Sequence, residues 1–506
     1  MFNLKTTYLT ALSSLLFIAP TMAATVEVNG FIGFDTSIIS KYDRGNSVGD
    51  IGKPDGTAGE INDWKTYKKS QAINTQGKNT ASFQTYIFHL DPTIIINDAA
   101  TIKGEISTNY GRGGFLGEST QSAQDGTWAG PTYLLSTTAQ NGIERKNVLS
   151  INQLYTELYT DFGTIQIGRF AQHWGLGAIN HAGNDPWNRY VTAKDGISIK
   201  AKIGHFKITP WWAKINNGAT YSSSTGQREY GLALLYDNPE RDLMLGVAYS
   251  NRRAKSNLGN GIFNQDGDTG AGANGHPITS AKIKVFSLFA KKVYKKFSFG
   301  MEVPIANGYF SNLYNDQGKT NYNAHALLFE LSYKKSPKWS FASKLGYVSG
   351  DKGKVDKFSA FYVNPNYQIA SLLFNYNLVN MANNDASIWD CYLTNVKYLR
   401  LQATYATDKW DYTGAIITAI ANEVAKNGKP AFNHEKNYRF DAAADQKKSY
   451  GTEIDLDLTY HWNQEIAVTG SIGYLLAGDY YAFTNAENKA KVQNPYLIQA
   501  KVGMNF

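Results

Sequence analysis

The sequence predicts an all-β protein, a single transmembrane antiparallel β-barrel of about 18 strands, on three observations. Aromatic residues make up 13% of the chain and glycine supplies 46 of its 506 residues, a composition typical of strands and tight turns. Segments in which polar and apolar residues alternate recur from residue 26 to the end. Between these segments, short turns and long polar connections follow one another in strict alternation.

The first 23 residues, 1–23, have the pattern of an export signal. Lys5 gives a positive start, residues 9–19 form a short apolar segment, and residues 20–23 end in small side chains suited to cleavage before Ala24. The apolar segment is shorter than the ~20 residues of a spanning helix, and no later stretch supplies ~18 consecutive apolar residues. We therefore expect residues 24–506 to form one exported barrel domain without a helical anchor.

The clearest strand is the last one, residues 496–506. Apolar side chains occupy every second position, at Tyr496, Ile498, Ala500, Val502, Met504 and Phe506. A strand of a soluble protein usually alternates for about 5–6 residues, whereas this one runs for about ten, the length that crosses a bilayer at a tilt. The preceding hairpin repeats the pattern around a tight turn at 462–465. A soluble sandwich would not need so long a strand, and the absence of a fixed-length repeat disfavours a propeller or solenoid.

The connections give the strand count. Short turns are expected near 97–98, 161–163, 204–205, 238–240, 295–296, 334–338, 407–409 and 462–465. Long polar connections are expected near 38–79, 111–147, 171–195, 214–227, 251–280, 307–322, 350–395, 420–448 and 478–494. With a first strand at 26–34, this gives about 18 strands, with short periplasmic turns and long extracellular loops. The region 350–395 leaves 16 or 20 strands open, because 369–378 is apolar enough for a strand, an inserted loop segment or part of a plug.

Two short segments resemble a known family. Residues 152–169 are similar to the strand–turn–strand of Gram-negative general porins, in which an aromatic residue and a Leu precede a Phe-Gly turn and the next strand ends in Gly-Arg. The terminal Phe506, preceded by alternating apolar residues, resembles the signal read by the outer-membrane barrel assembly machinery. The resemblance implies a water-filled channel in the outer membrane of a Gram-negative bacterium, surrounded by lipid and passing small hydrophilic solutes. It also favours assembly as a homotrimer. About 18 strands is closer to the sugar- or acid-specific porins than to the sixteen of general porins.

In general porins the arginine of the Gly-Arg pair can line the pore constriction, and the resemblance carries this role to Arg169. The alternation in this chain complicates the transfer, because Arg169 shares its face with Ile165 and Ile167. Either a bulge at Gly168 turns Arg169 inward, or its side chain extends to the outer membrane interface. Both positions of the Arg169 side chain are consistent with the sequence.

Charged residues within alternating strands are expected to face the lumen, because a charge on the lipid face costs ~2–4 kcal/mol at the membrane midplane. Besides Arg169, the expected pore-lining residues are Lys103, Glu105, Lys200, Lys202, Glu302, Arg400, Glu453, Asp455 and Asp457. The basic residues lie on the early strands and at Arg400, and the acidic ones lie near the strands that close the barrel. Opposed walls of charge would set a transverse field in a narrow pore, whereas in a wide lumen the same charges would only be solvated.

Inward-facing aromatic residues would be needed for a sugar-stacking track. The alternation places Phe31, Trp211 and Tyr398 in the lumen, although their spacing does not form an obvious line. The connection 171–195 contains His173, Trp174 and a turn around Asp185–Arg189, which suits either a surface loop or a loop folded into the pore.

Catalysis and cofactor binding are not expected. The chain has no nucleophile elbow, phosphate loop or dinucleotide fingerprint, and its eight histidines lack the spacing of a metal site. The formal charge of +8 without a continuous basic run indicates ions or an anionic lipid surface as partners rather than nucleic acid. The function expected is passive diffusion of small hydrophilic solutes, with lumen charges tuning selectivity. The alternatives are a structural or adhesive barrel whose lumen is occluded by loops, and a substrate-specific porin for sugars or organic acids.

Overall fold

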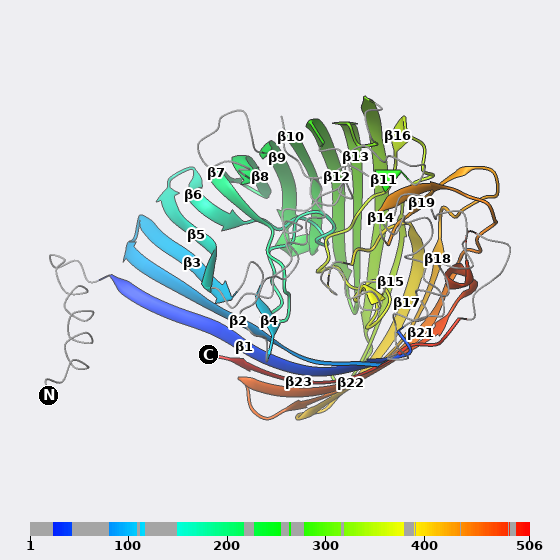
Figure 1. Cartoon of the computed structure of the whole chain (residues 1–506). Helices are drawn as coiled ribbons and strands as arrows, with labels where there is room; N and C mark the ends of the chain where they lie inside the picture. Colours follow the sequence, from blue (N-terminus) through cyan, green and yellow to red (C-terminus); the bar gives the residue numbers. More distant parts are fainter. Residues whose placement is uncertain are drawn as a thin grey trace, which may run out of the picture.

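The wall of the molecule is one antiparallel sheet closed on itself (Figure 1). This computed structural model describes residues 24–42, 80–108, 112–116, 149–216, 227–254, 263–264, 278–314, 318–378, 389, 391–435, 437–483, 485 and 492–506. The sheet has 20 strands, of which the short β4 (Gly113–Phe115) and β16 (Lys357–Phe358) only extend or flank longer ones, so 18 strands form the barrel. The predicted all-β barrel of about 18 strands is confirmed, and 16 or 20 strands are excluded.

The wall strands follow one another around the barrel in chain order. They are β1 (Thr25–Ser40), β2 (Thr80–Asn97), β3 (Ala100–Thr108), β5 (Leu149–Thr160), β6 (Gly163–Ala171), β7 (Ala193–Ile203), β8 (Phe206–Asn216), β9 (Gln227–Asn238), β10 (Leu243–Ala254), β12 (Ser280–Tyr294), β13 (Phe297–Ser311), β14 (Lys319–Lys334), β15 (Trp339–Val348), β17 (Val396–Ala406), β18 (Trp410–Ala421), β21 (Ser449–His461), β22 (Ile466–Ala477) and β23 (Tyr496–Asn505). A small separate sheet contains β11 (Phe263–Asn264), β19 (Pro430–Asn433) and β20 (Tyr438–Asp441). No helix among the described residues is long and apolar enough to cross a membrane.

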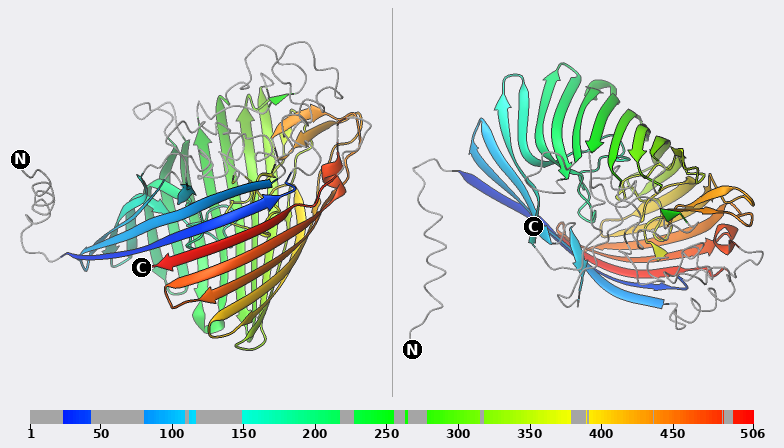
Figure 2. Two further views of the ribbon diagram at one scale, coloured as in Figure 1. Left: turned by 60° about the horizontal axis from the view of Figure 1, so that its bottom comes forward. Right: turned by 45° about the horizontal axis from the view of Figure 1, so that its top comes forward.

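The first and last strands close the barrel. β1 pairs with β2 on one side and with β23 on the other, as the adjacent blue and red ribbons of Figure 2 show. The closing ladder reaches the last residue, because Gly30 N donates to Phe506 O at 2.8 Å and Phe506 N donates to Gly30 O at 3.1 Å. β23 is thus paired with β1 along its whole length, as strands in lipid require, whereas residues 25–29 of β1 extend past it and pair with β2 alone.

The connections alternate as the sequence predicts. Each expected short turn joins two wall strands at the end where β1 begins and β23 ends, and the strand ends that flank the long connections lie at the opposite end. The connection expected at 307–322 is shorter than predicted, because β13 continues to Ser311 and β14 begins at Lys319. Counted along the chain, the third long connection, residues 172–192, is called L3, and the seventh, residues 349–395, is called L7. The described residues of L7 contain only the short β16 and no wall strand, so the region 350–395 is an inserted loop. The expected export signal at 1–23 lies outside the described residues.

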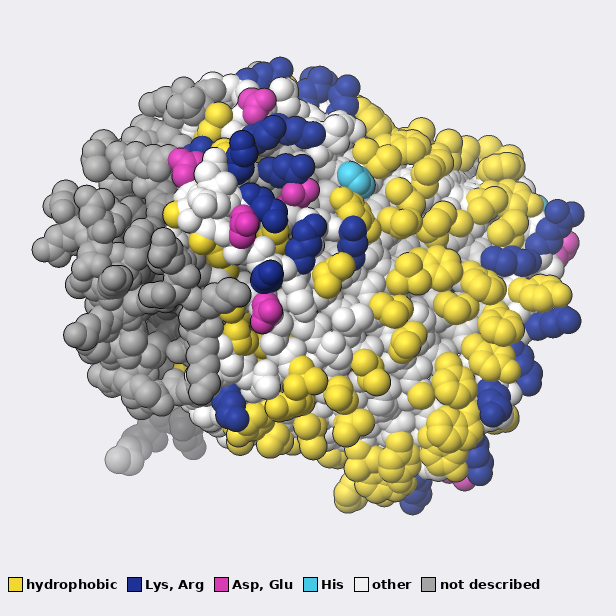
Figure 3. Space-filling model, turned by 90° about the vertical axis from the view of Figure 1, so that its right-hand side faces the viewer, with side chains coloured by type: hydrophobic (Ala, Val, Ile, Leu, Met, Phe, Trp, Pro, Cys, Tyr) yellow, Lys and Arg dark blue, Asp and Glu magenta, His cyan; other side chains and the backbone are white. Residues whose placement is uncertain are grey.

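The outer face of the barrel is apolar. Exposed Leu, Ile and Val side chains alternate with inward residues along the strands, among them Leu232, Leu401, Ile416, Leu456, Ile472 and Ile498. They form a broad hydrophobic surface (Figure 3). Aromatic rings meet near the short turns, with centroids 5.0 Å apart for Trp339 and Tyr405 and 4.7 Å apart for Trp410 and Tyr460. A closed barrel with an apolar outer band and aromatic girdle is a transmembrane barrel of the Gram-negative outer-membrane type.

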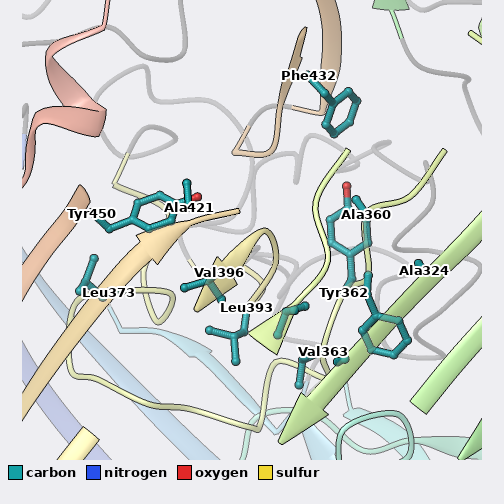
Figure 4. Close-up of a cluster of buried hydrophobic side chains, with 14 of the residues drawn as sticks. Ala324, Ala360, Tyr362, Val363, Leu373, Leu393, Val396, Ala421, Phe432 and Tyr450 are labelled. Atoms are coloured by element: carbon teal, nitrogen blue, oxygen red, sulfur yellow. The ribbon is translucent and has the colours of Figure 1, made fainter. Parts of the chain in front are cut away.

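Part of the interior is a packed hydrophobic core. Side chains of L7, including Val363, Leu373 and Leu393, pack against inward residues of the wall such as Ala324 and Val396 (Figure 4). Several of these side chains are fully buried. L7 therefore fills the lumen along β14 to β21.

Candidate functional site in the barrel lumen

L3 and L7 fold into the lumen and bond to each other. Asn364 N donates to Ala178 O at 2.8 Å, and the Asn366 amide donates to Tyr190 O at 2.7 Å. The Tyr190 hydroxyl donates to Trp389 O at 3.1 Å. The inward position that the sequence left open for L3 is thus the observed one. These bonds join the two loops into one partition across the barrel interior.

Glu302 on β13 anchors the tip of L3. One oxygen of its carboxylate, Oε2, accepts from Leu176 N at 2.8 Å and from Ala178 N at 3.1 Å. The other, Oε1, accepts from the Ser287 hydroxyl at 3.2 Å, and the Trp174 indole donates to the same hydroxyl oxygen at 3.1 Å. Glu302 faces inward as predicted, but L3 covers it completely, so it positions the loop and does not contact the pore solvent.

Glu105 on β3 supports L3 from the opposite wall. Its carboxylate accepts from Arg112 Nε at 2.8 Å and Nη2 at 2.9 Å, and also from Asn152 and Gln153 side chains. Arg112 in turn donates to the Gly183 carbonyl of L3 at 2.5 Å. Glu105 is 1% exposed, so this predicted lumen residue is inward-facing but buried beneath an arginine.

The acids of β21 anchor L7 in the same way. Glu453 accepts from Leu372 N at 2.6 Å and Leu373 N at 2.8 Å, and Asp455 accepts from Ser371 N at 3.2 Å. Backbone N–H groups removed from water need such acceptors, and carboxylates are strong ones. Both carboxylates are buried, whereas Asp457, one inward position further on, is only half-buried.

Arg400 on β17 completes the L7 anchor. Its Nη1 donates to the Ile369 carbonyl at 2.7 Å and lies 3.6 Å from Asp455 Oδ2. Of the four predicted charges in this part of the lumen, three therefore hold L7 and one, Asp457, remains accessible.

A polar cavity of about 160 Å³ lies beside the L3–L7 junction. Asp35, Asp185, Trp187, Arg189 and Lys501 contribute charges and an aromatic ring to its lining. Arg189 Nη2 lies 3.1 Å from Asp35 Oδ2, and the Lys501 ammonium lies 5.6 Å from the centre of the Trp187 ring. Asp35 and Lys501 are in register on neighbouring wall strands, and Arg189 of L3 is paired with Asp35, so the wall and L3 place both signs of charge in one cavity.

A larger cavity of about 500 Å³ lies between L3 and the wall from β9 to β15. Its lining includes Lys291, and Lys344 with Glu330, whose nitrogen and oxygen are 3.0 Å apart. His173 and Trp174 of L3 form its other side. This side of the lumen is open, in contrast to the side filled by L7.

The predicted lysines of the early strands face the lumen. Lys103 Nζ lies 2.9 Å from Glu157 Oε2 on the neighbouring strand. Lys200 and Lys202 share the inward face of β7 with the buried Ser198, opposite the outward Ile197 and Ile203. These lysines form a basic wall that remains accessible inside the barrel.

Arg169 does not line the pore, which corrects the role carried over from the porin resemblance. It is in register with Asp195, and its Nε and Nη2 donate to the Asp195 carboxylate at 2.6 and 2.9 Å. Arg169 lies on the same face of β6 as the exposed Ile167, whereas Gln166 and Phe170 face inward. Gly168 has a φ of +128°, but the inward and outward alternation of the strand continues through it. Gly168 therefore does not turn Arg169 inward, and the Arg169 side chain lies on the outer face.

The inward aromatic residues do not form a track. Phe31 packs edge-on against Trp187 with centroids 5.2 Å apart, and the Trp211 indole donates to buried Glu229 at 2.9 Å. The Tyr398 hydroxyl donates to that of Tyr367 at 3.2 Å. Each ring supports a different part of the wall or loops.

Three loop groups have shifted pKa values. Burial, with smaller contributions from His173, Arg112 and Lys344, lowers the pKa of His181 to about 4. Burial lowers the pKa of His434 to about 3 and raises that of Asp351 to about 6. His181 Nδ1 accepts from Gly183 N at 3.0 Å, so its neutral form is the one that fits L3.

Sequence reasoning missed the arginines that organise the site. Arg112 and Arg189 lie in connections where no alternation marks a direction, and their partners Glu105 and Asp35 are 7 and 154 residues away. Lys501 was detectable, because it alternates with the apolar residues of the last strand. No group of three or more His, Cys, Asp or Glu side chains that could hold a metal occurs in the described part of the chain.

No family model and no curated protein matches this sequence. Among solved structures, the chain is similar to OpdQ of Pseudomonas aeruginosa, with 10% identity and a TM-score of 0.46 over 95% of this chain and 98% of that one. It is similar to OccK2 (OpdF) of the same organism, with 8% identity and a TM-score of 0.47 over 95% and 98%. It is also similar to OccAB4 of Acinetobacter baumannii, with 10% identity and a TM-score of 0.46 over 96% and 99%.

Proposed function

We propose that this protein is an outer-membrane channel that passes small hydrophilic solutes through a fixed, mixed-charge opening beside the L3–L7 junction. The supporting observation is the polar cavity there, which Arg189, Lys501, Asp35 and Asp185 line together. Opposite charges held across a narrow opening orient dipolar solutes and favour polar ones over apolar ones.

The opening is held rigidly, which favours selection among solutes over free diffusion. L3 is fixed by Glu302 and by Arg112, and L7 is fixed by Glu453, Asp455 and Arg400. Because the wall bonds the backbone in the middle of both loops, the diameter of the opening cannot adapt freely to larger solutes. We therefore propose a selective channel, with Lys103, Lys200, Lys202 and Asp457 tuning the charge preference of the vestibules.

A second candidate is a structural or adhesive barrel with a closed lumen. It is favoured by one observation, the hydrophobic core that L7 builds inside the barrel along β14 to β21. The larger cavity beside β9 to β15 argues for an open path, since a purely structural barrel has no need of it.

Proteoliposome swelling separates the two candidates. Vesicles containing the purified protein are placed in isosmotic solutions of small sugars, amino acids or organic acids. A selective channel swells vesicles quickly with some of these solutes and slowly with others of similar size. A closed barrel gives no swelling with any, and a general diffusion pore gives rates ordered by size alone.

We further propose that Phe506 is the residue that the barrel assembly machinery reads and that the barrel assembles as a homotrimer. Phe506 is 51% exposed on the outside of the closing seam, where another protein can contact it. Replacing Phe506 with Ala should lower the yield of folded barrel in the outer membrane without changing refolding in detergent. Sedimentation of the detergent-solubilised protein measures its oligomeric state.

A further inference from the structure

The polar cavity beside the L3–L7 junction has no net charge. Among the described residues that line it, the carboxylates of Asp35 and Asp185 balance the cations of Arg189 and Lys501. Charges of both signs in equal number favour neither a cation nor an anion by long-range attraction. Which solute fits the cavity therefore depends on the groups that remain free to contact it.

Arg189 is already occupied by the protein. Its Nη2 donates to the Thr85 hydroxyl at 2.6 Å and lies 3.1 Å from Asp35 Oδ2, and its Nη1 donates to the Tyr86 carbonyl at 3.3 Å. The guanidinium carbon lies 4.4 Å from the centre of the Trp389 ring. Arginine binds a carboxylate best through two parallel N–H donors, and Arg189 uses donors of both terminal nitrogens within the protein. This cavity is therefore poorly suited to a solute that needs a free arginine.

The free groups of the cavity include both donors and acceptors. The exposed Gln368 side chain makes no hydrogen bond within the described part of the chain. Asn188 Oδ1 accepts from Asp185 N at 3.0 Å, which leaves the NH₂ group of Asn188 free. Asp185 Oδ1 accepts from Trp187 N at 2.8 Å, which leaves the other carboxylate oxygen free. The Lys501 ammonium makes no ion pair with any described residue and adds a further donor.

Trp187 of L3 supplies a fixed apolar surface beside these groups. Its ring lies against Gly33 and Gly503, which are in register on the closing strands β1 and β23. A Cβ would lie 2.8 Å from the ring if added to Gly33 and 3.0 Å from it if added to Gly503. The two glycines thus make room for the ring, and Phe31 packs against it edge-on. The cavity combines a positioned aromatic ring with free amide, carboxylate and ammonium groups.

We propose that this cavity binds a neutral polyhydroxylated solute, a monosaccharide or sugar alcohol, in preference to an organic acid. The inference rests on the channel proposed above and names its solute class. Every hydroxyl both donates and accepts hydrogen bonds, and amides offer the same two roles. The C–H groups of such a solute pack on an aromatic ring. An organic acid only accepts, and it would meet two carboxylates and one free cation.

Block of the ion current in planar bilayers tests the proposal on the full-length barrel. The current of inserted channels in potassium chloride is recorded while D-glucose is added, because a solute that occupies a narrow path excludes ions from it. Sodium gluconate, which keeps the carbon chain and most hydroxyls but carries a carboxylate, and glycine, a zwitterion, are the comparison solutes. Two variants, W187A and Q368L, remove the ring and the free amide separately, so that one remains informative if the other fails to fold.

Q172L is the matched control for Q368L. Gln172 begins L3, lies outside the lining of both cavities, and its Oε1 has no hydrogen-bond partner among the described residues. The same amide is thus replaced by the same apolar side chain in the same lumen. A general effect of glucose on the solution would lower the current equally in all of these proteins.

We expect glucose to lower the wild-type current saturably, and gluconate to need roughly tenfold higher concentrations. W187A and Q368L should each raise the half-blocking glucose concentration roughly five- to tenfold, and Q172L should leave it unchanged. Block by gluconate or glycine at concentrations equal to or below those of glucose would overturn the proposal, as would equal block of W187A, Q368L and the wild type. A wild-type protein that passes no ions would overturn the channel and the sugar site together, whereas a steady ion current that glucose does not lower would overturn the sugar site alone.

Discussion

At the residue scale, the acids inside this barrel divide into two groups according to what covers them. Glu302, Glu453 and Asp455 lie beneath loops and accept bonds from loop backbone N–H groups. Glu330 and Asp457 keep contact with the lumen. A buried loop must satisfy its backbone donors, so an inward carboxylate is as much a means of holding a loop as of attracting a cation.

Replacing Glu302 with Ala should loosen L3. The change leaves the N–H groups of Leu176 and Ala178 without their acceptor, at a cost of about 1–3 kcal/mol. We expect larger current fluctuations in planar bilayers than for the wild type. Glu330→Ala removes an inward acid that holds no loop backbone and is the matched control. Equal fluctuations in the two variants would contradict the anchoring role.

Charge selectivity should depend on Lys501 and not on Arg169. Lys501 lines the polar cavity, whereas Arg169 is paired with Asp195 on the outer face. We expect Lys501→Gln to move the reversal potential in a salt gradient toward cation preference. Arg169→Gln should leave the reversal potential where it is. A shift of the reversal potential caused by Arg169→Gln would contradict this prediction and would indicate that Arg169 lines the pore.

Acidification should weaken the L3–L7 junction through His181. Its pKa in the folded protein, about 4, is below the usual 6.5, so folding favours the neutral ring. The contribution of His181 is complete above pH 6.5 and is lost as the pH falls toward 4. We expect opening and closing events in single-channel recordings to become more frequent as the pH falls over this range. His181→Asn should weaken this dependence on pH. Asp351 in L7 has the opposite effect on stability, because its pKa is raised to about 6 and folding favours its protonated form. A pH profile that His181→Asn leaves unchanged would show that His181 is not the group responsible.

At the element scale, β6 depends on a glycine at the base of L3. Gly168 has a φ of +128°, and a Cβ there would collide with the backbone of Leu154 and Tyr155 on β5. Gly168→Ala should destabilise the β5–β6 pair by about 1–3 kcal/mol, measured as a lower temperature of barrel unfolding on gels. Gly470→Ala on β22 is the control, because nothing lies within 4 Å of the added carbon. Equal unfolding temperatures would contradict this requirement.

The strand pattern was predictable from the sequence because it is local. Lipid on one side and water on the other force period-2 alternation in every strand, and each turn interrupts it, so turns, loops and facing directions could be read directly. The same alternation already indicated that Arg169 shares a face with Ile167, and the structure agrees with it rather than with the porin resemblance.

The arrangement of the loops could not be predicted in the same way. Glu302 meets L3 across 126 and 124 residues of chain, and Glu453 meets L7 across 81 and 80. No periodic signal connects such partners, and an inward acid looks alike in the sequence whether it faces water or a loop. The pore-lining set predicted from alternation therefore mixes accessible residues with buried anchors.

At the scale of the whole molecule, the barrel is asymmetric inside. L7 builds a hydrophobic core against β14 to β21, and L3 crosses the remaining space with a polar cavity and a larger, mixed one beside it. We propose that this partition leaves a narrow, permanently open path. Packing that fixes both loops would keep its size constant, since packed interiors deform little.

Single-channel recording in planar bilayers tests this claim most directly. We expect discrete insertions of one small, stable conductance, with loop-anchor variants such as Glu302→Ala giving larger and noisier currents. Folded protein that inserts but conducts no current, in the wild type and in the anchor variants alike, would contradict an open path through the barrel.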